Sequence, residues 1–330
     1  MTALRKVGIA GLGRYVPEGR LTNADLEKKV DTSDEWIVQR TGVRERRIAR
    51  ADEVTSEMAA KAATDALADA GLTAADIDLV ICCTVTPDQM FPATACEIGH
   101  RLGATRAGGF DLSAACSGFV LGAQTAAHFV ATGAVDRVLV VGVEKLSSIV
   151  NYQDRGTCIL FGDGAGAAVF TTHDRARRGE FVSGSAGMRG GSTEILSLPA
   201  GGTRIPTSHA SIDAGLHFIQ MQGRQVYRFA VTTFVDVVRK AMEPHGGVEK
   251  LAALVPHQVN QRIIEAAAEE LGVPLERIFV NIDRYGNTSA ASVPIALYEA
   301  RAAGRLPEGG LVCCVAFGAG LTWGHLLLRW

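Results

Sequence analysis

The chain has 330 residues, of which 47% are hydrophobic and 21% charged, and its formal net charge is −2. This weak charge gives no bulk attraction to nucleic acid or to an anionic membrane surface. No apolar run reaches the roughly 18–20 residues that cross a bilayer, and the first residues lack the pattern of a signal peptide. We therefore expect a cytoplasmic protein that binds neither nucleic acid nor membranes.

Apolar stretches alternate with helical patterns along the chain. The pattern predicts a helix over residues 56–70 and buried strands over 6–10, 78–85, 138–143, 165–170, 251–255 and 311–317. Such alternation predicts an α/β fold whose sheets are mostly parallel and buried on both faces.

Two glycine-rich segments, residues 8–13 and 161–167, are interpreted as structural turns. The first leads to Tyr15-Val16-Pro17 and not to a helix, so it lacks the helix N-terminus that a dinucleotide-binding loop needs. A dehydrogenase is therefore not predicted.

The two ends of the chain share an order of elements: strand, helix, small-residue turn, helix, strand. Seventeen positions separate Cys116 from Gly133, and seventeen also separate Asn287 from Gly304. The repeat predicts two α/β halves, residues 1–172 and 173–330, with Cys116 and Asn287 at equivalent corners.

Seven cysteines occur, and none forms a CxxC pair or has zinc-ligand spacing, so no metal site is predicted. Cys116, in DLSAACSGF, differs from the others because it precedes an apolar helix and is surrounded by small residues. A helix start stabilises a thiolate, which suits a nucleophile. The alternative is a small buried hydrophobic residue.

His257 in LVPHQVN and Asn287 in DRYGNTSAASVP each lie between a predicted strand and a predicted helix. A polar residue there is often a helix cap. The repeat favours a second interpretation, in which both residues lie close to Cys116.

Six segments together resemble the β-ketoacyl-acyl carrier protein synthase III family: DTSDEWIVQRTGVRERR, DLSAACSGF, DRGTCILFGDGAGAAVF, PHQVN, GNTSAASVP and FGAGLTWG. The resemblance covers essentially the whole chain. It implies a thiolase-like fold with two duplicated halves in α/β/α/β/α layers. It also implies an acyltransferase that starts fatty-acid synthesis by condensing a short acyl-CoA with malonyl-acyl carrier protein. No cofactor is implied, since the CoA thioester is a substrate.

The resemblance also assigns residue roles. The catalytic triad is Cys116, His257 and Asn287, and the backbone N–H groups of Cys116 and Ala319 form the oxyanion hole, although relatives usually have glycine at position 319. The substrate- and partner-binding positions are Trp36, Arg40 and Arg155 for CoA, Phe91 for the acyl pocket across a homodimer, and Arg262 with Arg228 for the carrier protein.

Three acidic residues, Glu265, Glu269 and Glu270, share the predicted docking helix and repel an acidic carrier protein. They keep open a starter synthase of the same fold that uses malonyl-CoA or another acceptor. From another class, a non-catalytic acyl-CoA-binding partner subunit stays possible, although such a subunit typically lacks the nucleophile. A degradative thiolase needs a second catalytic cysteine, and Cys313 and Cys314 lie inside a strand.

Overall fold

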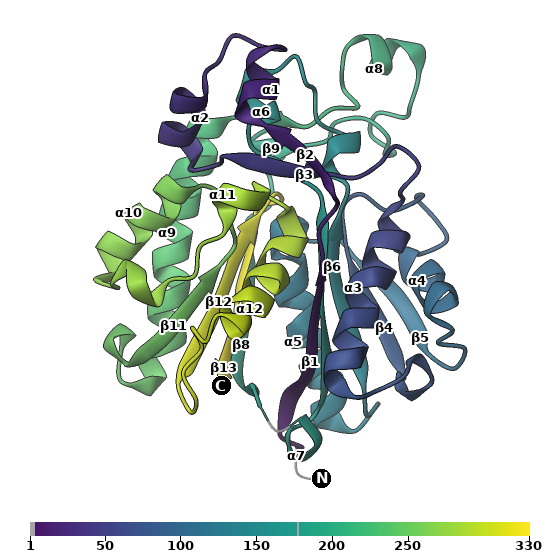
Figure 1. Ribbon diagram of the computed structural model, residues 1–330, viewed down its shortest axis with the longest axis vertical. Helices are drawn as coiled ribbons and strands as arrows, with labels where there is room; N and C mark the ends of the chain where they lie inside the picture. The colour runs from purple at the N-terminus through teal and green to yellow at the C-terminus, as the bar shows by residue number, and fades with distance from the viewer. Residues whose placement is uncertain (1–3, 177) are drawn as a thin grey trace.

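Two mixed β-sheets organise the computed structural model, which describes residues 4–176 and 178–330 (Figure 1). The first sheet has the order β1 (Val7–Tyr15), β7 (Gly164–Thr172), β6 (Val138–Glu144), β4 (Leu79–Cys83) and β5 (Gly108–Leu112). The second has the order β8 (Glu180–Met188), β13 (Thr322–Arg329), β12 (Leu311–Gly318) and β11 (Leu251–Pro256). The chain passes from one sheet to the other between Thr172 and Glu180, next to the predicted division between halves.

The prediction of mostly parallel sheets is wrong. β4 pairs in parallel with β5 and with β6, and β11 with β12, whereas the other four pairings are antiparallel. Only three residues separate β12 from β13, and so short a connection joins antiparallel neighbours. A run of apolar residues indicates that a strand is buried on both faces. It does not indicate whether the strand is parallel or antiparallel to its neighbours.

The second sheet repeats the first. The series β8, β13, β12, β11 has the same order of antiparallel, antiparallel and parallel pairs as β1, β7, β6, β4. Where the first sheet adds β5, the second has only a parallel bridge between Leu254 and Ile278. The shared topology confirms a fold of two duplicated α/β halves.

The predicted equivalence of Cys116 and Asn287 is wrong by three residues. In each half a non-glycine residue of positive φ begins a 3-10 turn, Ala115 (φ 47°) and Ser289 (φ 48°), and a helix starts three residues later. Cys116 is thus matched by Ala290. The shared spacing of seventeen is a coincidence, because the two helices have 15 and 11 residues.

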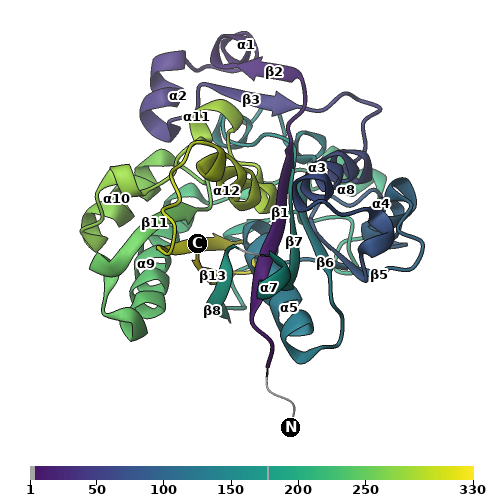
Figure 2. The ribbon, with the colours of Figure 1, turned by 60° about the horizontal axis from the view of Figure 1, so that its bottom comes forward.

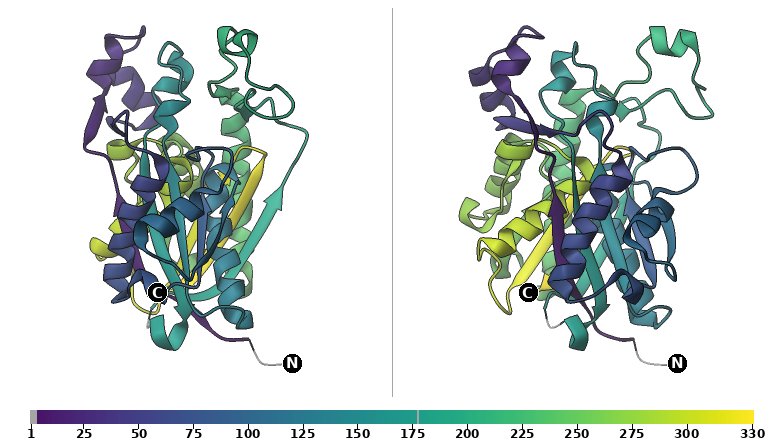
Figure 3. Two further views of the ribbon diagram at one scale, coloured as in Figure 1. Left: turned by 90° about the vertical axis from the view of Figure 1, so that its right-hand side faces the viewer. Right: turned by 45° about the vertical axis from the view of Figure 1, so that its right-hand side comes forward.

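Helices occupy three layers around the two sheets (Figures 2 and 3). The central layer holds α5 (Gly118–Thr132) and α12 (Ser292–Ala302), whose buried faces join both sheets in one core. Helices α3 (Thr55–Ala70) and α4 (Thr94–Leu102) cover the outer face of the first sheet, and α9 (Gly223–Met242) and α10 (Gln261–Leu271) cover that of the second. This is the α/β/α/β/α arrangement that the resemblance implied.

The first glycine-rich segment forms part of strand β1 and not a turn, so that prediction is wrong. A Cβ atom on Gly11 would lie 2.1 Å from the carbonyl oxygen of Ala66, and one on Gly13 would lie 2.2 Å from that of Ala62. The glycines therefore let helix α3 pack directly on the strand. The helix over residues 56–70 that the sequence predicted is confirmed by α3. The second segment is not a turn either, since Phe161 forms a parallel bridge with Asn287 and β7 begins at Gly164.

Shorter elements gather at the end of the molecule where the strands β4, β6 and β12 finish (Figures 1 and 3). They are β2 (Gly19–Thr22), α1 (Asn23–Glu27), α2 (Asp34–Thr41), β3 (Glu45–Ile48), α6 (Arg155–Cys158), β9 (Leu196–Ser197), α8 (His209–Asp213), β10 (Gln220–Met221) and α11 (Ile282–Tyr285). The remaining helix, α7 (His173–Ala176), lies at the opposite end. Among the described residues, no helix has the length and apolar character needed to cross a membrane.

Candidate active site

One cavity of about 500 Å³ draws its lining from both halves of the chain. Seven of the predicted site residues line it: Trp36, Arg40, Cys116, Arg228, His257, Arg262 and Asn287. Three others, Phe91, Arg155 and Ala319, are not part of its wall. The fold therefore brings the predicted triad and one end of the predicted CoA site into a single space.

Cys116 is the middle residue of the turn Ala115–Ser117, directly before α5, and only 7% of it is exposed. The strand end of β12 lies against this turn, because a Cβ atom on Gly318 would lie 2.7 Å from the Cys116 nitrogen. Burial raises the pKa of the Cys116 thiol to about 12, and a side-chain hydrogen bond with Ser289 lowers it only partly. Burial therefore opposes the stabilisation of the thiolate that the helix start was expected to give.

His257 follows β11, and its backbone N–H donates to Val315 (2.8 Å). The ring Nδ1 lies 2.6 Å from the Ser292 hydroxyl, which also accepts from the backbone N–H of Gln258 (3.3 Å). The hydroxyl can donate its proton to Nδ1 or accept from an Nδ1–H group with its second lone pair; when it donates, the ring proton lies on Nε2. Burial lowers the pKa of His257 to about 3, so the imidazole is neutral.

The Nε2 atom of His257 is buried and has no hydrogen-bond partner within residues 4–176 and 178–330. With the ring proton on Nε2, this atom offers an N–H group that a bound molecule can accept from. The helix-cap interpretation of His257 is wrong, because Asn260 caps α10 through its side-chain oxygen, 2.9 Å from the nitrogen of Arg262.

Asn287 is held by both backbone and side chain. Its N–H donates to Leu160 (2.8 Å), and its Oδ1 accepts from the N–H of Ser289 (2.8 Å). The preceding Gly286 has φ 65°, and a Cβ atom there would lie 2.5 Å from the Leu160 oxygen. Because Oδ1 caps the Ser289 turn, the NH₂ group is the end of the amide left to donate toward the cavity.

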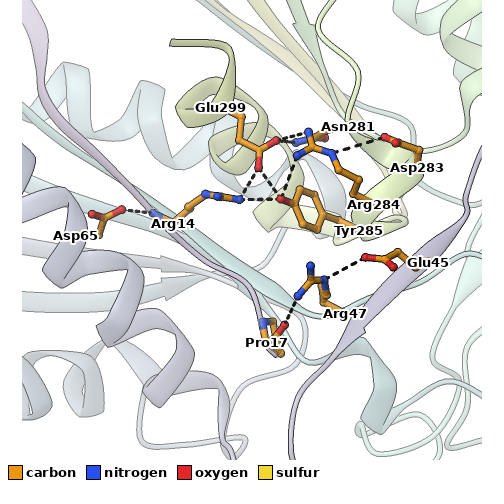
Figure 4. A network of polar contacts seen from close by, with 10 residues as sticks. All are labelled: Arg14, Pro17, Glu45, Arg47, Asp65, Asn281, Asp283, Arg284, Tyr285 and Glu299. Carbon is orange, nitrogen blue, oxygen red and sulfur yellow. Dashed lines mark hydrogen bonds and ion pairs between the residues drawn. The ribbon is translucent and has the colours of Figure 1, made fainter. Parts of the chain in front are cut away.

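A buried polar network fixes the loop that leads to Asn287 (Figure 4). Its centre is the carboxylate of Glu299 on α12, which accepts from Tyr285 (2.6 Å), Asn281 (2.9 Å) and Arg284 (2.7 Å) of that loop. Arg14 of β1 also donates to this carboxylate. The network therefore ties the Asn287 loop to both halves of the molecule.

The predicted CoA-binding side chains form one cluster around the Trp36 ring. Trp36 is the third residue of α2, and the Ser33 hydroxyl at the N-cap accepts its N–H (3.2 Å). The guanidinium carbon of Arg155 lies 4.9 Å from the centre of the indole ring, and that of Arg40 lies 5.6 Å from it. Arg155 thus belongs to the same cluster although it does not line the cavity.

The predicted carrier-protein positions lie on neighbouring helices. Arg228 of α9 and Arg262 of α10 are exposed, and the guanidinium of Arg262 lies 6.0 Å from the ring centre of Tyr227. Farther along α10, the Glu270 carboxylate lies 3.6 Å from Arg239. This ion pair offsets part of the acidic charge that the sequence placed on the docking helix.

Two predicted residues, Phe91 and Ala319, do not line the cavity with the triad. Phe91 is 85% exposed on the loop before α4, and its position across a dimer stays a prediction. Ala319 lies between β12 and β13, where the Thr322 hydroxyl anchors the connection to Ser117 (2.7 Å) and to the oxygen of Ala114 (3.1 Å). The connection adjoins the Cys116 turn, and the oxyanion role of Ala319 also stays a prediction.

Sequence analysis missed a fully buried carboxylate beside the triad, Glu144 at the end of β6. It accepts from the hydroxyls of Thr86 (2.7 Å), Ser289 (3.0 Å) and Thr84 (3.2 Å) and from the N–H of Val85 (3.1 Å). Burial raises its pKa to about 7, although these hydrogen bonds pull it down. An acid that ends the apolar run VLVVGVE was the signal available in the sequence.

Comparison with known proteins gives consistent matches. A family model described as 3-oxoacyl-[acyl-carrier-protein] synthase III matches residues 110–187, and the model of its C-terminal part matches residues 244–330. The β-ketoacyl-[acyl-carrier-protein] synthase III of Symbiobacterium thermophilum is 52% identical, with 99% of each chain covered.

Two solved structures are also similar to this chain over nearly its whole length. The 3-oxoacyl-[acyl-carrier-protein] synthase III of Aquifex aeolicus is 44% identical with a TM-score of 0.90, covering 98% of this chain and 100% of its own. The priming β-ketosynthase of the R1128 polyketide pathway is 37% identical, also with a TM-score of 0.90, over 99% and 97% of the two chains.

The layered fold and these matches define a thiolase-fold acyltransferase of the condensing type. Within this class, the curated relatives match over essentially the full length of the chain. The chain belongs to the β-ketoacyl-acyl carrier protein synthase III family.

Proposed function

We propose that the enzyme starts fatty-acid synthesis by joining a short acyl group, taken from acyl-CoA, to malonyl-acyl carrier protein. The observation that carries this proposal is the single cavity that connects the Trp36–Arg40 cluster with Cys116, His257 and Asn287. A flat indole beside two guanidinium groups suits a nucleotide base, and the buried cysteine suits a covalent acyl intermediate.

In the first half-reaction, the Cys116 sulfur attacks the thioester carbonyl, the acyl group passes to Cys116, and CoA leaves as a thiolate. The negative charge that develops on the carbonyl oxygen needs N–H donors at the turn. Backbone groups of Cys116 and Ala319 are proposed for this role, since both belong to segments that pack together at Gly318.

In the second half-reaction, the malonyl group loses carbon dioxide and its carbanion attacks the acyl-Cys116 thioester. The enolate oxygen formed on decarboxylation is stabilised by hydrogen bonds from neutral donors. Because these donors are uncharged, the site does not have to desolvate a second charge. Neutral His257, through Nε2–H, and Asn287, through its NH₂ group, supply two such donors from one wall of the cavity.

The proposed assembly is a homodimer in which Phe91 closes the acyl pocket of the partner subunit. A bulky ring there favours an acetyl-sized or small branched primer. The exposed side chain of Phe91 supports this proposal, because large apolar side chains on a surface mark contacts with other molecules.

The carrier-protein acceptor is proposed to dock beside Arg228 and Arg262. A second candidate, a starter synthase that takes malonyl-CoA, is favoured by the exposed Glu265 and Glu269 on the same helix. An acidic carrier protein is repelled by these residues, whereas a small CoA thioester enters past Trp36.

The test is the intact mass of the protein after mixing with acetyl-CoA, followed by a chase with malonyl-acyl carrier protein or malonyl-CoA. One acetyl group on Cys116, absent in Cys116→Ala and discharged by the carrier-protein substrate, supports the initiation enzyme. Discharge by malonyl-CoA alone supports the starter synthase. No acetylation by any short acyl-CoA supports a non-catalytic partner subunit.

A further inference from the structure

The buried carboxylate of Glu144 lacks a compensating cation. Within the described part of the chain, the groups that donate to it are neutral: three hydroxyls and a backbone N–H. The adjacent Lys145 points elsewhere, since its ammonium group donates to the backbone oxygens of Arg50, Ala51 and Glu53. Burying an unpaired carboxylate is costly, which makes Glu144 a poor choice for a purely structural residue.

Ser289 connects this carboxylate with the nucleophile. Its hydroxyl donates to Glu144 Oε1 (3.0 Å). The Ser289 turn packs against the Cys116 turn, and the same hydroxyl is near enough to the sulfur to lower the pKa of the Cys116 thiol. A hydroxyl has one proton, so when it donates to Glu144 its lone pairs are available to the thiol proton. The contact is built into the fold, because Ser289 has φ 48° and its N–H is held by Asn287 Oδ1 (2.8 Å).

We propose that Glu144 is the base that receives the Cys116 proton, through the hydroxyl of Ser289. The Cys116 S–H proton moves to Ser289 Oγ while the Ser289 O–H proton moves to Glu144 Oε1. The products are a thiolate, a re-formed hydroxyl that donates to it, and a neutral carboxylic acid. The buried site carries one negative charge before and after the transfer, so no new charge is desolvated.

The relay rests on the proposed function for the steps that follow, and it closes the catalytic cycle. Attack on acyl-CoA releases a CoA thiolate and leaves the proton on Glu144. Condensation later expels Cys116 as a thiolate, which takes the proton back through Ser289. The resting thiol and carboxylate are then restored without a proton from the cavity.

His257 is less suited to this task. Its Nε2 atom has no partner in the described residues, so the Cys116 thiol does not donate to it. Charging this buried ring would also place a cation where burial holds the imidazole neutral. The relay leaves His257 as a neutral donor for the malonyl group, and the two half-reactions use different groups.

Three buried thiols feel the charge of Glu144. Cys82 and Cys83 of β4 are fully buried, and burial raises both of their pKa values, with a smaller contribution from the Glu144 charge. Cys116 on the facing turn is the third. Of these three thiols, Cys116 is the one that lines the cavity. The rate at which Cys116 reacts with a small reagent therefore tests whether the relay operates.

The experiment measures the rate of Cys116 alkylation by iodoacetamide from pH 5.5 to 9.5, followed by peptide mass because the exposed Cys96 also reacts. The wild-type rate rises with an inflection near the pKa of Glu144, about 7, and then levels off. In Glu144→Gln this inflection disappears. The rate at pH 8 falls at least tenfold, a conservative figure because general-base catalysis typically contributes roughly 10²-fold or more.

Two further variants separate the relay from general damage. Ser289→Ala keeps the carboxylate but removes the connection, and alanine tolerates this backbone since Ala115 has the same φ; its rate falls as in Glu144→Gln. Thr84→Val removes one hydrogen bond from the far oxygen of Glu144 and keeps the inflection. Wild-type profiles in both Glu144→Gln and Ser289→Ala overturn the proposal. Because alkylation needs no acyl-CoA, this outcome is independent of the acetylation test.

Discussion

The Nδ1 atom of His257 lies 2.6 Å from the hydroxyl oxygen of Ser292, the first residue of the central helix α12. A donating Ser292 hydroxyl keeps the ring proton on Nε2, the tautomer that the proposed decarboxylation needs. The strand β11 provides the backbone of His257 and the helix orients its ring, so any change in their packing alters the direction of the Nε2–H group.

Replacing Ser292 with alanine is expected to lower malonyl decarboxylation by roughly tenfold or more, because the ring loses the donor that keeps its proton on Nε2. Acetylation of Cys116 is expected to continue. Steady-state decarboxylation and single-turnover acetylation measure the two steps separately. Equal losses in both steps would contradict the orienting role, and Ser292→Thr, which retains a hydroxyl, is the control.

Gly318→Ala is expected to impair acetylation of Cys116 strongly. The new Cβ atom meets the Cys116 nitrogen at 2.7 Å, so the turn must move, and overpacking of this kind costs about 1–3 kcal/mol of unfolding free energy. The matched control is Gly190→Ala, where the Cβ atom meets open space. Single-turnover acetylation and urea unfolding of both variants test this, and normal acetylation in Gly318→Ala would contradict it.

The sequence allowed the triad to be proposed because each residue follows a strand end in a motif of fixed residue types. Motifs, however, carry no information about burial. The helix start predicted an acidic Cys116, whereas the surrounding core raises its pKa to about 12. The register of the repeat failed for a similar reason, since spacing alone does not reveal that α5 and α12 differ in length.

Tertiary packing also decided the elements that were mispredicted. Residues 8–13 have turn-like composition, but the strand β1 needs glycine where α3 lies against it. Glu144 was missed because its partners come from two segments distant in sequence, the Thr84–Thr86 stretch and the Ser289 turn. A single sequence does not show which strand ends are neighbours.

Glu299→Gln is expected to lower the free energy of unfolding by about 2–4 kcal/mol, since Arg14 and Arg284 lose a nearly buried counter-charge. The Asn287 loop is expected to loosen, which slows decarboxylation. Urea unfolding and decarboxylation assays measure the two effects. Glu45→Gln removes only partly exposed ion pairs and is the control, with an expected change below about 1 kcal/mol.

The pH dependence of stability is expected to contain two opposing contributions. The folded pKa of His257 is about 3, below its ordinary 6.5, so only the unfolded chain takes up a proton as pH falls from 6.5, and stability is lost. The folded pKa of Glu144 is about 7, above its ordinary 4.5, so its contribution is full below pH 4.5 and is lost as pH rises through 7.

Urea unfolding between pH 4.5 and 6.5 separates these contributions. His257→Gln removes the first, so this variant gains stability relative to wild type as pH falls, at no more than about 1.4 kcal/mol per unit. Glu144→Gln removes the second and changes in the opposite direction. Parallel curves for wild type and both variants would contradict the two pKa shifts.

Trp36→Ala is expected to raise the KM for acetyl-CoA by roughly tenfold, because the indole stacks with the Arg155 guanidinium 4.9 Å away and an inserted base gains contact with both. The first-order rate of Cys116 acetylation at saturation is expected to stay unchanged, since the proposed contact of Trp36 is with the nucleotide and not with the reacting carbonyl. The acetyl thioester of N-acetylcysteamine, which lacks the nucleotide, is the matched control and should react equally with both enzymes. A similar loss with this truncated thioester would mean that Trp36 shapes the cavity near Cys116 and does not bind the nucleotide.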